Sequence, residues 1–410
     1  MNVERMEFIV ERVAKDEEWV LVTGNGFDLH HCLPTRYVDF LDVVNRLMEL
    51  DEEGKLQNCQ WLAYILGDQS PLYGSNEMIK KCYDVHRDVI NSTQLDEEKL
   101  QNMVDLAKEN MWMQYFSYED FRNVGWIDFE KEISRVIKAF QNMIVGMNKH
   151  CKQGDIVYVE ESELSPENYH IVTHKAFETF FSEDGLKEEY WHIQRDADEA
   201  IYLSVNEQCL AEKLYVELDT FITILDWYIT EFIQKISVNK QSNNKLFSMC
   251  DRVITFNYTD TFSLLYDKEH IKTISYVHGS ALGDNIVLGI NDDENDQLKT
   301  LNLAFVEFKK YYQRTYKKTD YDYERILPQG GKYQLHFVGH SMDITDSDIL
   351  KLLIKDEKVQ KSVIYYHDDK SHGQVIKNVI ALFGKDEFEE LRRKHKIEFK
   401  ELDGFAPSII

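Results

Sequence analysis

An apolar run of five residues, Trp-Val-Leu-Val-Thr at positions 19–23, stops abruptly at Gly24. Its length and β-branched content are typical of a buried parallel strand. Beyond Gly24, apolar residues between positions 29 and 41 recur with helical spacing, and Pro34 marks a break between two helical pieces. A strand, a glycine turn and helical chain form the first half of a βα unit, which needs further parallel strands beside it.

Strand-like and helical segments alternate again in the last third of the chain. The strand-like runs cover residues 253–256, 273–277, 286–290, 335–338, 363–366 and 397–399, and helical spacing covers residues 346–354 and 375–383. Strands that alternate with helices indicate a doubly wound, mainly parallel sheet. We therefore predict an α/β fold with a Rossmann-like sheet.

Helical spacing dominates the middle of the chain. Apolar residues recur at three- and four-residue steps from Ile133 to Ile144. The same spacing from Leu210 to Ile236 predicts a helix of about seven turns. A short strand is expected in this region at residues 155–159.

These patterns divide the chain into two predicted units. Residues 1–50 and 250–410 are expected to form one discontinuous nucleotide-binding α/β domain. Residues 51–249 are expected to form an all-helical insertion between its two parts.

Composition restricts the partners of such a chain. Lys and Arg number 47 against 73 Asp and Glu, a net charge of −26, which argues against non-specific binding of nucleic acid. The six cysteines include no CxxC pair, a pattern typical of free thiols in a reducing compartment. No apolar run suits a signal peptide or a membrane-spanning helix, so we expect a cytoplasmic protein with no membrane partner.

The most informative motif follows the first strand. Gly24-Asn25-Gly26-Phe27-Asp28 places two positions without a side chain at the start of a helix, where backbone N–H groups are free to meet a ligand. A carboxylate at Asp28 would repel a phosphate, so its predicted partners are ribose hydroxyls or a base edge. The competing interpretation is a tight turn in which Asp28 only stabilises the helix start.

Two further candidates follow other strands. Thr255 and Asn257 lie at the carboxyl end of the run at 253–256, where doubly wound sheets bind ligands, and the Asn257 amide both donates and accepts hydrogen bonds. Asn257 and Asp260 could equally cap the next helix. His278, followed by Gly279, has the residue type of a general base, although a single histidine among 14 carries little weight by itself.

A fourth candidate repeats the same design. After the run at 335–338 come Gly339, His340, Ser341 and Asp343, which are expected to close the same pocket from another strand. Asp346 and Asp348 are interpreted as helix-start residues. The stretch 308–318 interleaves lysines with tyrosines, and we favour a helix face or a phosphate clamp over a surface for single-stranded nucleic acid.

Taken together, these blocks resemble the AbiH family of phage abortive-infection proteins. The resemblance rests on residues 24–40, 126–130, 255–259, 278–279 and 339–343, in that order. Thr35, in the first block, joins the predicted ligand-binding residues, and Cys32 stands where the pattern has glycine. The resemblance implies defence by halting or killing the infected cell, with a phage-encoded trigger and the insertion as its sensing or homo-oligomer surface.

The order of the motifs is also similar to that of sirtuin-like NAD-binding proteins. This similarity implies that Asn257 positions the ribose or the attacking water and that His278 acts as the base. The zinc-binding cysteines of protein deacetylases are absent, so the similarity favours hydrolysis of NAD at the nicotinamide–ribose bond, with no metal. The alternatives are a metal-dependent nuclease or nucleotide hydrolase, with its metal on Asp28, Asp343 or nearby carboxylates, and a non-catalytic nucleotide-binding sensor or scaffold.

Overall fold

The structure is a computed structural model that describes most of the chain. The described residues are 17–117, 128–150, 164–182, 185–195, 201–236, 245–266, 271–291, 303–319, 327–328 and 330–402. The strand expected at 155–159 lies outside these residues.

The described residues form a six-stranded parallel sheet, which confirms the α/β class. Its strands are β1 (Glu18–Thr23), β6 (Arg252–Thr255), β7 (Thr273–Tyr276), β8 (Tyr333–Val338), β9 (Val359–Tyr366) and β10 (Ile397–Glu401). Their order across the sheet is β10-β9-β8-β1-β6-β7. β1 lies in the middle, with Val22 opposite Ile254 of β6 on one side and Phe337 of β8 on the other. The chain therefore builds outward from β1 in both directions.

One predicted strand is wrong. The run at 286–290 forms no strand, and only Ile290 makes an isolated parallel bridge, to Lys309. Ile286 and Leu288 are buried in the same hydrophobic cluster as the helices of the middle region. The run is apolar because it packs as a buried loop, which hydrophobicity alone does not distinguish from a strand.

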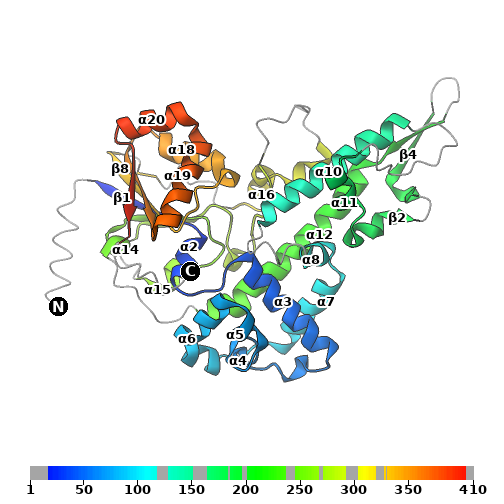
Figure 1. The fold of residues 1–410 in the computed structure, drawn as a ribbon, viewed down its shortest axis with the longest axis horizontal. Coiled ribbons are helices and arrows are strands. Elements are labelled where there is room, and N and C mark those ends of the chain that lie inside the picture. Colours follow the sequence, from blue (N-terminus) through cyan, green and yellow to red (C-terminus); the bar gives the residue numbers. More distant parts are fainter. Residues whose placement is uncertain are drawn as a thin grey trace.

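Helices cover both faces of the sheet (Figure 1). Val20 and Val22 of β1 pack on one side with α18 (Ser347–Lys355), α19 (Asp369–Phe383) and α20 (Lys385–Arg393). Leu21 packs on the opposite side with α2 (Asn25–His30), α14 (Lys245–Met249) and α15 (Thr261–Leu265). Successive side chains of a strand alternate between faces, so a central strand buried on both needs an unbroken apolar run. Residues 19–23 supply it.

The middle of the chain is a block of helices beside the sheet (Figure 1). Its main helices are α3 (Tyr37–Glu52), α4 (Leu62–Leu66), α5 (Pro71–Ser75), α6 (Glu77–Ser92), α7 (Glu97–Glu109), α8 (Met111–Phe116), α10 (Phe129–His150), α11 (Pro166–Val172), α12 (Glu207–Tyr228) and α13 (Gln234–Ile236). The long helix predicted from residue 210 is confirmed, and it continues from α12 into α13 through the π-helical turn η4 (Ile229–Ile233). Among the described helices, none has both the length and the apolar character required to cross a bilayer.

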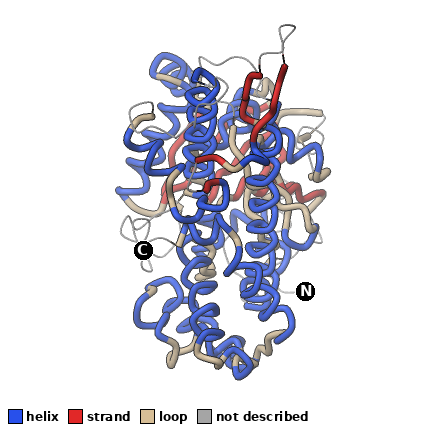
Figure 2. The backbone as a smooth tube through the Cα atoms, turned by 90° about the vertical axis from the view of Figure 1, so that its right-hand side faces the viewer, coloured by secondary structure: helices blue, strands red, loops and turns tan. Residues whose placement is uncertain are grey.

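The block is not all-helical, which corrects the sequence prediction. It contains the short pair β2 (Phe181–Ser182) and β3 (Gly185–Leu186) and the hairpin β4 (Trp191–Arg195) and β5 (Ile201–Val205), both antiparallel. Figure 2 shows a hairpin extending from one end of the block. Strands this short are stabilised by pairing with their partner, so they leave little periodic signal in the sequence.

The loop between α2 and α3 shows why the AbiH-like pattern has glycine at the position that Cys32 occupies in this chain. Its backbone has a φ of 56°, in the left-handed region that favours glycine. Cys32 follows His31, the last position of the α2 cap, and Leu33 N donates to Asp28 O at 3.1 Å to close the turn. The chain keeps the conformation at this position without the residue that adopts it most easily.

The glycine turn after β1 packs against the loop after β8. Gly26 N donates to Gly339 O at 2.8 Å, and Phe27 N donates to Gly24 O at 2.8 Å. A Cβ atom on Gly339, whose φ is 66°, would lie 2.1 Å from Phe27 N, and one on Gly26 would lie 2.8 Å from the Gly339 Cα. The N–H groups predicted to meet a ligand are therefore used within the protein at Gly26 and Phe27, and the glycines allow two backbones to touch.

Replacing Gly339 with alanine should strongly destabilise the fold. Because the new methyl group would overlap backbone atoms and the φ is unfavourable, we expect Gly339→Ala to lower the free energy of unfolding by about 3 kcal/mol or more. Gly373 of α19 has open space around its Cβ position and is the matched control. Gly373→Ala should raise the free energy by about 0.5–1 kcal/mol. Urea unfolding followed by circular dichroism measures both, and equal effects would contradict the packing argument.

Candidate functional site

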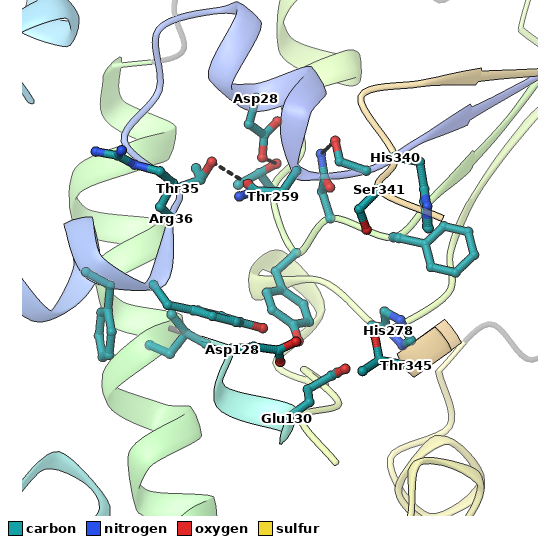
Figure 3. Close-up of a pocket in the computed structure, with 18 of the residues that line it drawn as sticks. Asp28, Thr35, Arg36, Asp128, Glu130, Thr259, His278, His340, Ser341 and Thr345 are labelled. Atoms are coloured by element: carbon teal, nitrogen blue, oxygen red, sulfur yellow. Dashed lines mark hydrogen bonds between the residues drawn. The ribbon is translucent and has the colours of Figure 1, made fainter. Parts of the chain in front are cut away.

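The main cavity lies where the carboxyl ends of the central strands face the helical block. Its volume is about 190 Å³. One side is formed by residues that follow β1, β6, β7 and β8, and the other by residues of α3, α10 and α12. In Figure 3, Asp28 and Thr259 lie on one side of the cavity, and Asp128 and Glu130 lie on the opposite side. The strand ends of a doubly wound sheet are where ligands are expected.

The structure brings most of the predicted site residues to this cavity. Those that line it are Gly24, Asn25, Asp28, Thr35, Asn257, His278, His340, Ser341 and Asp343. Gly26 and Gly339 are absent from the lining because they pack against each other. Phe27 lies in the sheet core against Phe247 and Phe262. Thr255 accepts a hydrogen bond from Asn257 N at 3.1 Å and lines a smaller neighbouring cavity.

Asp28 is a buried carboxyl group with one unused oxygen. Only 1% of the residue is exposed, and its Oδ2 accepts a hydrogen bond from Thr259 Oγ1 at 2.6 Å. Its Oδ1 is buried and has no hydrogen-bond partner. Burial raises the pKa of Asp28 to about 6. A buried acceptor without a donor is costly, so this oxygen is prepared for a hydroxyl group or a positive charge.

Polar side chains from two loops are fixed beside Asp28. Asn257 Nδ2 donates to Gly24 O at 3.1 Å, which leaves Oδ1 as the acceptor of this amide. Thr35 Oγ1 donates to Asn25 Oδ1 at 2.6 Å. The first bond joins the loops after β1 and β6, the second lies within the segment after β1, and all four residues line the cavity.

His278 and Asp346 form a buried pair on the cavity wall. Nε2 of His278 lies 2.9 Å from Asp346 Oδ1, and only 4% of the histidine is exposed. Burial, with Lys310 nearby, lowers the pKa of His278 to about 4, so the ring is neutral at pH 7. An ionised carboxylate only accepts hydrogen bonds, so Nε2 carries the proton and Nδ1 has a free lone pair. Nδ1 is buried and unpartnered.

Lys310 connects this pair to the helical block. It belongs to α16 (Lys310–Tyr316), is 1% exposed, and its Nζ lies 2.8 Å from Glu130 Oε2 and 2.9 Å from Asp346 Oδ1. Burial acts to raise the pKa of Asp346, but Lys310 and His278 outweigh it and hold this pKa well below its usual range. Burial raises the pKa of Glu130. Asp346 is therefore ionised and orients His278.

This cluster extends two sequence interpretations. Asp346 and Asp348 lie at the start of α18, as predicted, but the Asp346 carboxylate makes no cap hydrogen bond and instead contacts His278 and Lys310. The stretch at 308–318 forms α16, as the helix interpretation predicted, and Tyr311 and Tyr316 are exposed on it. Two of its cations face inward and pair with carboxyl groups: Lys310, described above, and Arg314, which is 2% exposed and whose Nη1 lies 2.7 Å from Asp348 Oδ2.

Sequence reasoning missed several residues of the wall. Asp128 and Glu130 start α10, and Tyr228 and Ile229 lie where α12 passes into its π-helical turn. The motif at 126–130 carried the family resemblance but gave no chemical signal, because its partner Lys310 is remote in the sequence. Within the described residues, no group of three or more His, Cys, Asp or Glu side chains is arranged to hold a metal ion.

Comparison with known proteins identifies the family. The sequence model of the family described as "Bacteriophage abortive infection AbiH" matches residues 20–368. The chain therefore belongs to the AbiH family, which indicates a role in phage abortive infection. A search of curated proteins gives no match.

Removing the charge of Asp28 should stabilise the protein. A carboxyl whose pKa is raised in the folded state binds protons more tightly there, so its contribution is lost as the pH rises from about 4 to 6. A shift of about two pKa units corresponds to about 3 kcal/mol. We expect Asp28→Asn to raise the free energy of unfolding at pH 7.5 by up to this amount and to change it little at pH 4. Denaturant titrations across this range test the difference, and a variant less stable than wild type at pH 7.5 would contradict it.

Proposed function

We propose that this chain is an abortive-infection effector that hydrolyses NAD at the nicotinamide–ribose bond. The observation that carries the proposal is the His278–Asp346 pair, in which a neutral imidazole from a cavity-lining residue has a buried and unpartnered Nδ1. Asp28, with its own unpartnered oxygen, lines the same cavity. Nδ1 of His278 is suited to accept a hydrogen bond from a water or a ribose hydroxyl, and the Asp28 carboxylate is suited to stabilise a developing positive charge.

The topology of the sheet supports a nucleotide ligand. Numbered by their order in the chain, the strands read 3-2-1-4-5-6 from β7 to β10, the order of dinucleotide-binding Rossmann folds. In such sheets the ligand binds where the strand order reverses, which is between β1 and β8 here. Gly24 after β1 and His340 after β8 both line the cavity.

The proposed reaction assigns a role to each side chain. The bond between C1′ of the ribose and the ring nitrogen breaks, and its electron pair neutralises the positively charged ring of the leaving nicotinamide. Positive charge develops on the ribose, where the Asp28 carboxylate stabilises it. The water oxygen bonds to C1′, and Nδ1 of His278 accepts the proton that the water loses. Asn257 holds the water or a ribose hydroxyl, and Asp346 fixes the imidazole orientation.

Variants of the two candidate catalytic residues should lose turnover without unfolding. We expect His278→Ala to lower kcat by about 10²-fold or more, because the proton of the attacking water then lacks an acceptor. Asn257→Ala should lower kcat/KM through poorer positioning. Release of nicotinamide from NAD, followed by chromatography, measures both. Exposed His170 of α11 gives the matched control, and His170→Ala should leave the rate unchanged.

An effector that damages its host must be held inactive until infection, so the assay is repeated in lysate of phage-infected cells. Loss of nicotinamide release in the His278 and Asn257 variants, with retained far-UV circular dichroism, supports the proposal. Intact NAD under both conditions contradicts it. A rate that falls on addition of a chelator would instead favour a metal-dependent nuclease or nucleotide hydrolase, because the proposed reaction uses no metal.

A further inference from the structure

The wall of the main cavity carries more acidic than basic side chains. Its carboxyl groups are those of Asp28, Asp128, Glu130, Asp343 and Asp346. Among the described lysines and arginines, only Arg36 contributes to this wall. Its guanidinium already donates two hydrogen bonds to the buried carboxylate of Asp39, at 2.9 and 2.7 Å. An anion entering the cavity therefore meets a cation that is already paired.

Nearby lysines offset only part of the acidic charge. Lys310 is shared between two carboxyl groups, as described above. Lys131 Nζ lies 3.1 Å from Asp128 Oδ2 and 3.0 Å from Asp343 Oδ2, so one cation again serves two carboxylates. Asp28 makes no ion pair with any of the described residues, and its side chain is buried. The wall keeps a net negative charge around pH 7.

The two buried side-chain atoms of the described wall that have no hydrogen-bond partner are both acceptors. Nδ1 of His278 and Oδ1 of Asp28 are both buried and unpartnered, and the two residues are 4% and 1% exposed. A phosphate carries negative charge and offers only acceptors, so it cannot satisfy either atom. A positively charged ring with ribose hydroxyls supplies both donors and charge. The cavity therefore fits the nicotinamide riboside part of NAD and not its phosphates.

The size of the cavity also fits the nicotinamide riboside part of NAD better than the whole dinucleotide. A single water needs roughly 10–15 Å³ of cavity volume. The cavity of about 190 Å³ then has room for roughly 13–19 water-sized groups. A nucleoside is of this order, whereas a complete dinucleotide is much larger.

We propose that the cavity holds only the nicotinamide riboside half of the ligand and selects pyridinium ribosides by their positive charge. The phosphates and the adenosine half remain outside the cavity. The identity of the ring rests on the proposed function, but the selection for positive charge follows from the wall itself. A positively charged riboside without any phosphate is thus the minimal ligand.

Binding tests this selection better than turnover does. The neutral dihydronicotinamide ring is a poor leaving group in any environment, so its failure to react would say nothing about the cavity. Carbocyclic nicotinamide riboside, in which a methylene replaces the ribose ring oxygen, keeps the charge and is not hydrolysed. Isothermal titration calorimetry on the full chain compares it with its neutral 1,4-dihydro form and with carbocyclic NAD. We expect the charged riboside to bind at least tenfold more tightly than the neutral one, and within tenfold of carbocyclic NAD.

Substitutions of residues in the cavity wall test which carboxylates cause the preference for the charged riboside. Asp28→Asn and Asp343→Asn should each reduce the charged-over-neutral preference at least threefold. The Asp343 side chain is 18% exposed, so its variant tests the idea at a second position of the wall, independently of the buried Asp28. Asp105→Asn, on the exposed side of α7, is the matched control and should leave the preference unchanged.

The outcomes separate this inference from the proposed reaction. Equal affinity for the charged and neutral ribosides would overturn the inference. So would a riboside that does not bind while carbocyclic NAD does, even where NAD is hydrolysed. Intact NAD together with charge-selective riboside binding would instead overturn the proposed hydrolysis and leave the inference standing.

Discussion

Two strand-end loops meet without room for a side chain, and the site depends on that contact. The turn after β1 and the loop after β8 approach until Gly26 N bonds to Gly339 O at 2.8 Å. This contact brings Asn25 and Asp28 from one loop beside His340 and Ser341 from the other. Met342, next in the second loop, is fully buried with a φ of 58°, a strained conformation that its packing maintains. The glycines therefore serve the ligand indirectly, by letting two loops that carry polar groups converge.

Sequence reasoning was most successful where a pattern is local. Five of the six runs interpreted as strands in the last third are strands, and the signal is clearest for β6 and β8, which flank β1 and are buried along most of their length. The run at 286–290 fails since a buried loop has the same composition. The hairpin of β4 and β5 could not be predicted from the sequence because its stability comes from pairing between the two strands.

The residues of the site also fall into those that a local sequence pattern predicts and those that only the folded chain brings together. Residues directly after a strand, such as Asn257 and His278, could be anticipated because the ends of parallel strands meet at one edge. The partner of His278 could not be predicted. The local sequence indicates only that Asp346 starts a helix, and it is the folded chain that brings its Oδ1 to 2.9 Å from the imidazole Nε2. Lys310 was assigned to a helix face or a phosphate clamp, although it is buried between the carboxyl groups of Glu130 and Asp346.

The buried lysine also explains why the helical block is part of the site and not an appendage to it. Glu130 starts α10, Asp346 precedes α18, and Lys310 from α16 lies between them. Moving α10 away would take Glu130 from Lys310 and leave the buried ammonium group with fewer hydrogen-bond partners, which is costly. The same lysine helps to keep Asp346 ionised, and Asp346 orients His278. The position of the helical block and the state of the imidazole are therefore linked through one ammonium group, so a rearrangement of the block would change both the electrostatics of the site and the shape of the cavity that the block lines.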